Sequence, residues 1–331
     1  MTTDARASAP PDPRALSAGE LRACYRTMLA VRWFEEEVMR LFQQGHVAGT
    51  THLCIGQEAV SAGVETALRE DDLVAATYRG HGQALARGVD LEALAAEMLG
   101  RKTGVCGGRA GSMNVVDLSR NLLGCFGIIG GTLATAIGAG LSVKGSGRVA
   151  VAYFGDGTTN HGYFHECLNF AKVQELPVLF VCENNGYGEF TPWREVTAGS
   201  DLLARAEVFG IPAESADGMD VRDVARVAHA AVARARDGQG PQFIEAVTYR
   251  FVGHSRSDPG AYRPPGELER WKERDPLLVA RQALIEDLGV PAEEVDADEQ
   301  AVQRQVAGGF EAALAAAPAD PARPATAYAH A

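Results

Sequence analysis

The sequence is short of positive charge. Its 331 residues include 31 Lys and Arg against 43 Asp and Glu, which gives a formal net charge of −12 at pH 7. An acidic chain is a poor ligand for nucleic-acid or membrane phosphates, so we expect neither as a partner. No apolar run approaches the ~20 residues that cross a bilayer, and residues 1–19 lack the apolar core of a signal peptide. We therefore expect a cytoplasmic protein.

Paired cysteines are also missing. The six cysteines, at positions 24, 54, 106, 125, 167 and 182, form no C-x-x-C pair, which argues against a zinc site or a redox dithiol. Linker segments and internal repeats are absent too. We therefore predict one domain over 18–315, a disordered N-terminal arm over 1–17 and a flexible tail over 316–331.

Alternating helical and strand patterns fill the rest of the chain. A capping box at Ser17 and Glu20 opens a helix that extends to Gly45. Helical spacing recurs at 90–101, 130–145, 163–175 and 220–238, and β-rich apolar runs lie at 148–154, 176–185 and 241–251. This alternation predicts an α/β fold, a parallel sheet with helices on both faces. The Gly- and Ala-rich helix at 130–145 indicates close packing, either in the core or at a subunit interface.

Polar residues follow two of the predicted strands. Asp156 stands in "GDG" after the strand at 148–154, and Asn184 and Asn185 end the next strand. Adjacent parallel strands lie about 5 Å apart, so these side chains can converge on one small ligand. Their oxygens suit Mg²⁺ or Ca²⁺, and the helix after "GDGTT" points free N–H groups at the same place. The sequence therefore predicts a metal-bound diphosphate, with a helix N-cap as the alternative role for Asp156.

These motifs resemble those of a known family. "GDG" followed by "NN" at this spacing is similar to the thiamine-diphosphate motif, and "HLCIGQEAV" (52–60), "TYRGHG" (77–82) and "YRFVGHSRSDPG" (249–260) extend the similarity. Over roughly residues 20–275 the chain resembles the α subunit of the decarboxylating component of 2-oxo acid dehydrogenase complexes, on the pyruvate and acetoin branches. The resemblance implies a thiamin-diphosphate-binding fold, with thiamine diphosphate and Mg²⁺ as cofactors.

The resemblance also implies roles for individual residues. The metal ligands would be Asp156, the side chain of Asn185 and the backbone oxygen of Tyr187. His254 and His52 would be catalytic. The residues that would bind the cofactor, besides these metal ligands, are Tyr78, Arg79, Gly127, Ile129, Gly157, Thr158 and His254.

The implied enzyme is an oxidoreductase that needs a second chain. It would decarboxylate a 2-oxo acid such as pyruvate, or cleave acetoin, and pass the acyl unit to a lipoyl acyltransferase component or another carrier. The chain is too short to hold both cofactor-binding modules of the self-sufficient members. We therefore expect a β subunit in an α₂β₂ heterotetramer.

Some positions depart from the pyruvate branch, and other functions stay open. Asn114, Phe126 and Thr132 stand where those relatives usually have His, Asn and Gln, which puts pyruvate itself in question. Ser255 and Ser257 match a loop that is phosphorylated in mitochondrial relatives, and here we interpret them as loop residues that order around the cofactor. The alternatives are a biosynthetic two-carbon-unit transferase, a nicotinamide-dependent dehydrogenase, because "GDGTTN" nearly fits G-x-G-x-x-G, and a non-catalytic partner subunit.

Overall fold

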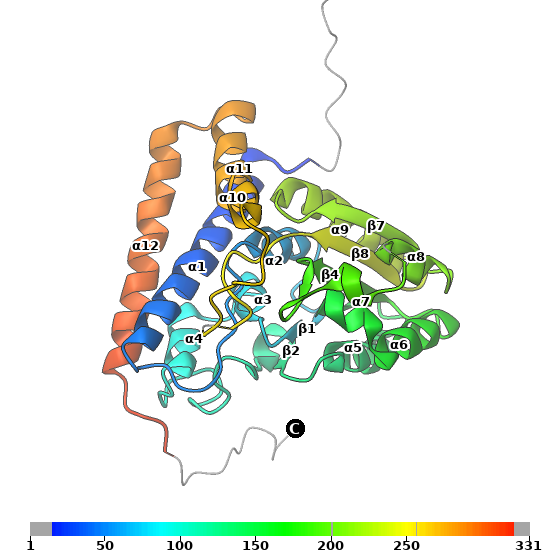
Figure 1. The fold of residues 1–331 in the computed structure, drawn as a ribbon, viewed down its shortest axis with the longest axis horizontal. Helices are drawn as coiled ribbons and strands as arrows, with labels where there is room; N and C mark the ends of the chain where they lie inside the picture. The colour runs from blue at the N-terminus through cyan, green and yellow to red at the C-terminus, as the bar shows by residue number, and fades with distance from the viewer. Residues whose placement is uncertain (1–14, 200, 256, 321–331) are drawn as a thin grey trace, which may run out of the picture.

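A six-stranded parallel sheet forms the centre of the molecule (Figure 1). The computed structural model describes residues 15–199, 201–255 and 257–320. The strands lie in the order β2-β1-β3-β4-β8-β7, and each neighbouring pair is parallel. Their bounds are β1 (Leu73–Thr77), β2 (Leu122–Phe126), β3 (Ala150–Gly155), β4 (Val178–Asn184), β7 (Ala213–Asp217) and β8 (Gln242–Val247). A short antiparallel hairpin, β5 (Tyr187–Gly188) and β6 (Thr191–Pro192), follows β4.

The helices confirm the alternating pattern. They are α1 (Ala18–Gln43), α2 (Glu58–Glu65), α3 (His81–Ala86), α4 (Leu91–Met98), α5 (Gly131–Val143), α6 (Gly162–Val173), α7 (Trp193–Val196), α8 (Leu202–Glu207), α9 (Val221–Arg236), α10 (Glu267–Lys272), α11 (Pro276–Gln282) and α12 (Ala292–Ala315), with shorter turns η1 (Leu118–Arg120), η2 (Asp156–Asn160) and η3 (Ala283–Asp287). The predicted capping box opens α1: the Glu20 amide donates to Ser17 Oγ over 3.3 Å, and the Ser17 amide donates to Glu20 Oε2 over 2.8 Å.

Two hydrophobic cores cover the two faces of the sheet. Alternate side chains of a strand point to opposite faces. Val151 therefore belongs to the core that includes residues of α1, α2 and α9, while its neighbour Ala152 belongs to the core that includes residues of α5 and α6. Both faces of β4 are buried along its whole length, as expected for a strand inside a parallel sheet. The prediction of an α/β fold with helices on both faces is therefore confirmed.

Some predicted elements end elsewhere. The strand predicted over 241–251 stops at Val247, because the chain then leaves the sheet and the Phe251 amide donates to Ile55 O over 2.8 Å. The Gly- and Ala-rich helix, α5, packs on the sheet within this chain: a Cβ on Gly140 would lie 2.6 Å from Val178 Cγ2. Its other side carries Leu141, which is 46% exposed. Packing in the core, one of the two explanations offered for this Gly- and Ala-rich helix, thus accounts for one face of α5. The face that carries Leu141 is exposed in this chain.

The chain ends are described only in part. Residues 1–14 of the predicted arm and 321–331 of the predicted tail lie outside the described residues, and the domain division stays a prediction. Within the described part of the tail, the Lys102 amide donates to Ala317 O and the Ala319 amide donates to Gly100 O, both over 2.9 Å. Over the described ranges, none of the helices has both the length and the apolar character needed to cross a bilayer.

Candidate active site

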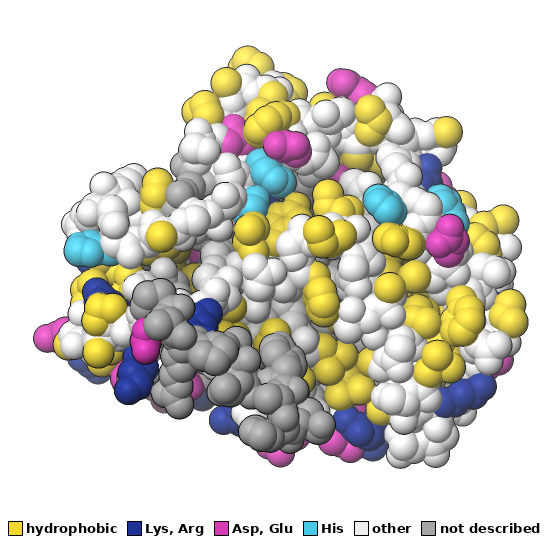
Figure 2. All heavy atoms as spheres, turned by 90° about the horizontal axis from the view of Figure 1, so that it is seen from below, with side chains coloured by type: hydrophobic (Ala, Val, Ile, Leu, Met, Phe, Trp, Pro, Cys, Tyr) yellow, Lys and Arg dark blue, Asp and Glu magenta, His cyan; other side chains and the backbone are white. Residues whose placement is uncertain are grey.

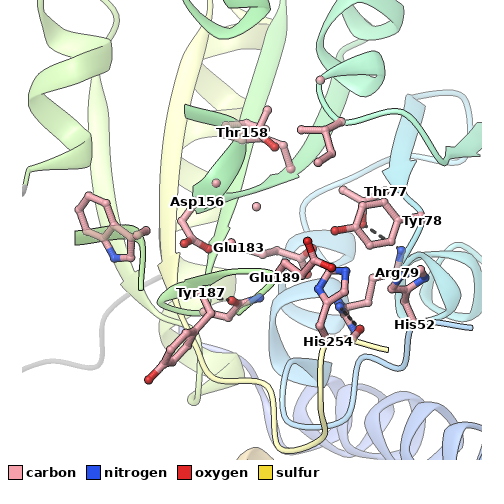
Figure 3. Close-up of a pocket in the computed structure, with 18 of the residues that line it drawn as sticks. His52, Thr77, Tyr78, Arg79, Asp156, Thr158, Glu183, Tyr187, Glu189 and His254 are labelled. Carbon is pink, nitrogen blue, oxygen red and sulfur yellow. Dashed lines mark hydrogen bonds between the residues drawn. The ribbon is translucent and has the colours of Figure 1, made fainter. Parts of the chain in front are cut away.

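A cavity of about 620 Å³ opens at the carboxyl ends of β1, β3 and β4 (Figure 3). The chain leaves β1 toward β2 at one side of the sheet and leaves β3 toward β4 at the other. Ligands of open parallel sheets bind where the connections part in this way. The cavity is lined by Thr77, Tyr78 and Arg79 at and after the end of β1, by 154–158 at and after the end of β3, and by Glu183 and Asn185 at the end of β4.

Asp156 is the most unusual group in this cavity. It follows β3 directly, its side chain is fully buried, and neither carboxylate oxygen has a hydrogen-bond partner among the described residues. Burial raises the pKa of this carboxyl to about 7, although the nearby backbone amides of Asp156 and Asn185 act to lower it. Gly155, not Asp156, occupies the N-cap position of the turn that follows, so the capping alternative is wrong. A buried carboxylate with no partner fits a bound cation.

Asn185 lies beside Asp156 and is held by its neighbours. Its Oδ1 accepts from the Tyr187 amide over 3.2 Å, and its Nδ2 donates to Gln57 Oε1 over 3.3 Å. Asn184 behaves differently: its Nδ2 donates to Glu245 Oε1 on β8 over 2.7 Å. Of the two asparagines that were expected to converge with Asp156, only Asn185 lines the cavity.

The arrangement suits a hard cation with few protein charges. No cluster of three or more His, Cys, Asp and Glu side chains that could hold a metal ion exists within the described ranges. Asp156 would therefore be the one charged ligand, assisted by the Asn185 amide oxygen and a backbone oxygen at Tyr187. Mg²⁺ is commonly bound by one or two carboxylates together with substrate phosphates, so these residues fit a magnesium–diphosphate pair.

The two glycines beside this carboxylate differ in how close their neighbours lie. A Cβ on Gly157 would lie 3.3 Å from Gly188 Cα, so the turn after β3 and the β5–β6 hairpin approach closely. A Cβ on Gly155 would have nothing within 4 Å. Thr158, the next predicted contact, is buried and also lines the cavity.

Three aromatic rings meet in the lining of the same cavity. The His52 ring lies 4.5 Å from the Tyr78 ring and 5.0 Å from the His254 ring, centroid to centroid. Burial, followed by the nearby charge of Arg79, lowers the pKa of His52 to about 3 and that of His254 to about 4. Both imidazoles are therefore neutral near pH 7. In a neutral imidazole one ring nitrogen carries the proton and can donate it, while the other can accept one.

Two arginines connect these histidines. Arg79 is 5% exposed, and its guanidinium donates to Leu53 O and, over 2.8 Å, to His254 O. Arg250 Nη1 lies 3.1 Å from His254 Nδ1. Since an arginine can only donate, Nδ1 is the acceptor and the ring proton of neutral His254 sits on Nε2. The geometry thus fixes one tautomer of His254.

Sequence reasoning missed Arg250 and Glu183 as site residues. Both line the cavity, and both stand in segments that were recognised, "YRFVGHSRSDPG" and "VCENNGYG". Glu183 is 4% exposed and accepts from Gln83 Nε2 over 2.9 Å. Burial raises its pKa to about 7, and Arg79 acts in the opposite direction. A charged residue near the end of a buried strand was the available signal.

The remaining predicted residues divide into two groups. Gly127 and Ile129 line the cavity, as do Phe126 and Thr132, two of the three positions that depart from the pyruvate branch. Thr132 Oγ1 is buried with no hydrogen-bond partner among the described residues. Asn114, the third departure, is exposed and outside the lining, where its Nδ2 donates to Ala110 O over 3.5 Å.

Comparison with known protein families identifies the family of this chain. A family model described as "Dehydrogenase E1 component" matches residues 25–325. The chain belongs to this family. Members of the E1 component family use thiamine diphosphate, which agrees with the resemblance found in the sequence.

Named relatives cover most of the chain. The alpha subunit of an acetoin:2,6-dichlorophenolindophenol oxidoreductase from Bacillus subtilis is 42% identical over 266 residues, 80% of each chain. The pyruvate dehydrogenase E1 component subunit alpha of Porphyra purpurea is 40% identical over 290 residues, 85% of this chain and 84% of its own. A second acetoin oxidoreductase alpha subunit, from Cupriavidus necator, is 39% identical over 320 residues, 96% of this chain and 95% of its own. All three are named as alpha subunits, which implies a second subunit in each enzyme.

Proposed function

We propose that this chain is the α subunit of a thiamine-diphosphate-dependent dehydrogenase that acts on a 2-oxo acid or on acetoin. The observation that carries the proposal is the buried Asp156 carboxylate at the switch point of an E1-family sheet; this carboxylate has no hydrogen-bond partner within the described part of the chain. Bound thiamine diphosphate supplies the electron sink that allows a bond next to a carbonyl to be cleaved. The nicotinamide alternative finds no support in the family.

The chain's own residues would hold the two ends of the cofactor. Asp156, Asn185 and the Tyr187 backbone oxygen would hold Mg²⁺. Tyr78, Arg79 and the backbone of Gly157 and Thr158 would bind the diphosphate. The backbone at Gly127 and Ile129 would bind the aminopyrimidine ring. Since the diphosphate itself brings negative charge to Mg²⁺, the single carboxylate of Asp156 is enough negative charge from the protein.

His254 and His52 would take part in proton transfer during the reaction. His254 carries its proton on Nε2 because Arg250 donates to Nδ1, so Nε2–H can donate to an oxygen on which negative charge develops. His52 Nδ1 is buried with no partner among the described residues, which leaves it available to a ligand. Both rings are neutral, so neither adds a fixed charge to the site.

A β subunit would close the cavity and complete the site. Large hydrophobic side chains beside the cavity mouth and on α5 and α6 are between 43% and 74% exposed: Ile128, Ile129, Leu141, Tyr163, Phe170 and Val173. Figure 2 shows a face on which hydrophobic side chains gather over the centre while charged side chains lie mainly along the rim. An apolar area of this kind is typical of a protein interface. We propose an α₂β₂ heterotetramer that passes its acyl unit to a lipoyl acyltransferase component or another carrier.

The test is turnover of the chain with and without its β subunit. We expect reduction of an artificial electron acceptor with pyruvate, 2-oxobutanoate or acetoin, only when both chains, thiamine diphosphate and Mg²⁺ are present. Full activity of the isolated chain would refute the need for a second subunit. No activity of the assembled pair on any of these substrates would favour the two-carbon-unit transferase or the non-catalytic subunit.

A further inference from the structure

We propose that Glu35, in the middle of α1, is a positioning residue of the candidate active site. Its carboxylate holds three chain segments that line the cavity, through Cys54, His81 and Ser112. The inference rests on the proposed function, because its effect is measured on thiamine diphosphate binding. Neither Glu35 nor these three partners line the cavity themselves.

Both oxygens of Glu35 are used. Oε1 accepts from the Cys54 amide over 2.8 Å and faces Cys54 Sγ at 3.0 Å. Oε2 lies 2.8 Å from His81 Nδ1, and the side chains of Glu35 and His81 are both fully buried. Burial acts to raise the pKa of Glu35, but the His81 interaction and the Cys54 hydrogen bonds hold it below its usual value. An ionised carboxylate accepts only, so Nδ1 of His81 carries a proton.

His81 extends the contact to a third segment. Its Nε2 lies 2.9 Å from Ser112 Oγ, and Ser112 is 5% exposed. Glu35, His81 and Ser112 therefore form a continuous buried chain of hydrogen bonds. A network with all members satisfied in a dry interior holds its members rigidly.

Cys54 and His81, which contact Glu35, and Ser112, which contacts His81, each lie close in sequence to a residue of the cavity. Cys54 is two positions after His52, and the carbonyl of the intervening Leu53 accepts from Arg79. His81 begins α3, two positions after Arg79. Ser112 precedes Met113, which lines the cavity. One carboxylate therefore sets the relative positions of the loops that carry His52, Arg79 and Met113.

A role in folding alone is the competing explanation, because loss of a buried carboxylate that accepts hydrogen bonds leaves its donors unpaired and destabilises a protein. Asp72 provides a matched control. It is fully buried, it pairs with Arg236 over 2.7 Å, and it directly precedes β1 at the amino end of the strands, opposite the cavity. Asp72→Asn therefore removes a comparable buried charge without touching the cavity loops.

The experiment compares Glu35→Gln with Asp72→Asn in the assembled α and β chains. The measurements are calorimetric binding of thiamine diphosphate with Mg²⁺ and kcat, both taken below the unfolding transition of every variant, and, separately, the unfolding temperature of each variant. We expect Glu35→Gln to weaken cofactor binding at least tenfold and to lower kcat. We expect Asp72→Asn to lower the unfolding temperature while cofactor affinity stays within twofold of wild type.

Ser112→Ala is a second variant that removes only the outer hydrogen bond and leaves the Glu35–His81 contact in place. We expect a smaller loss of cofactor affinity in the same direction, about threefold. Wild-type affinity in a folded Glu35→Gln protein would overturn the inference. If Glu35→Gln does not fold, wild-type affinity in Ser112→Ala overturns it instead. Failure of the wild-type complex itself to bind thiamine diphosphate would refute the proposed function, which keeps the two failures distinct.

Discussion

Replacement of Asp156 by Asn should stabilise the protein while it removes cofactor binding. In metal-free protein the buried Asp156 carboxylate has no hydrogen-bond partner among the described residues, and its pKa rises from 3.8 to about 7. Each pKa unit corresponds to about 1.4 kcal/mol, so the ionised form destabilises the folded state by at most about 4 kcal/mol. The Asn amide is neutral but also buried, and an unsatisfied amide costs about 1–3 kcal/mol. The expected net gain from Asp156→Asn is therefore about 2 kcal/mol.

The sign of the pH dependence follows from the raised pKa. Folded protein holds the Asp156 proton more tightly than unfolded protein, so wild-type stability falls as the pH rises from about 4 to about 7 and then levels off. The variant lacks this titration. The stability difference between the two proteins should be small at pH 5 and should reach its full size at pH 8.

The assay is unfolding of both proteins in EDTA and without cofactor at pH 5, 6.5 and 8, followed by the same series with Mg²⁺ and thiamine diphosphate. Ligands that bind the folded state should raise the unfolding temperature of wild type and leave that of Asp156→Asn unchanged. A variant that is less stable than wild type at pH 8 without metal, or a difference that does not change with pH, would refute the reasoning.

Other variants test other parts of the site. His254→Ala should lower kcat at least tenfold with little change in cofactor affinity, as calorimetry beside turnover would show; equal losses in both would make His254 a cofactor anchor. Gly253→Ala should weaken cofactor binding and lower the unfolding temperature, because the new Cβ would lie 2.0 Å from Asp258 O; an unchanged unfolding temperature would mean that the loop can move aside. Phe190→Ala should raise kcat/KM for branched 2-oxo acids relative to pyruvate. The Phe190 ring lies 6.2 Å from the His254 ring, at the hairpin beside the cavity. An unchanged ratio of the two kcat/KM values would mean that the substrate does not bind beside Phe190.

The strands that were predicted have a common property. The runs at 148–154 and 176–185 are dense in Val, Phe and other apolar residues because both faces of β3 and β4 are buried. Their position at the centre of the sheet also explains why the sequence could place Asp156 and Asn185 at the carboxyl ends of the strands, where both line the cavity. Burial of a strand on both faces leaves a signal in the sequence that needs no knowledge of its neighbours.

Three strands of the main sheet were missed. β1 is buried but only five residues long, while β2 and β7 are the two edges of the sheet. β7 has the sequence "AESAD" and is half-exposed, and β2 contains Gly124 with a positive φ of 151°. Their pairing depends on partners far away in the chain, which short-range patterns do not report. The same reason hides the role of Glu35, because the residue that it meets, His81, is 46 positions away.

The packing of α12 on α1 sets a constraint on how the chain folds during synthesis. The Phe34 and Phe310 rings lie 5.0 Å apart, and Arg22 pairs with Asp298, 276 positions later. At about 5–20 residues per second, roughly 15 to 55 seconds pass between the synthesis of these partners. During that interval the apolar side of α1 has no cover from α12. We therefore expect nascent chains that end before residue 292 to associate with chaperones or to aggregate. We also expect the chain to bind its β subunit only after α12 has left the ribosome and packed on α1.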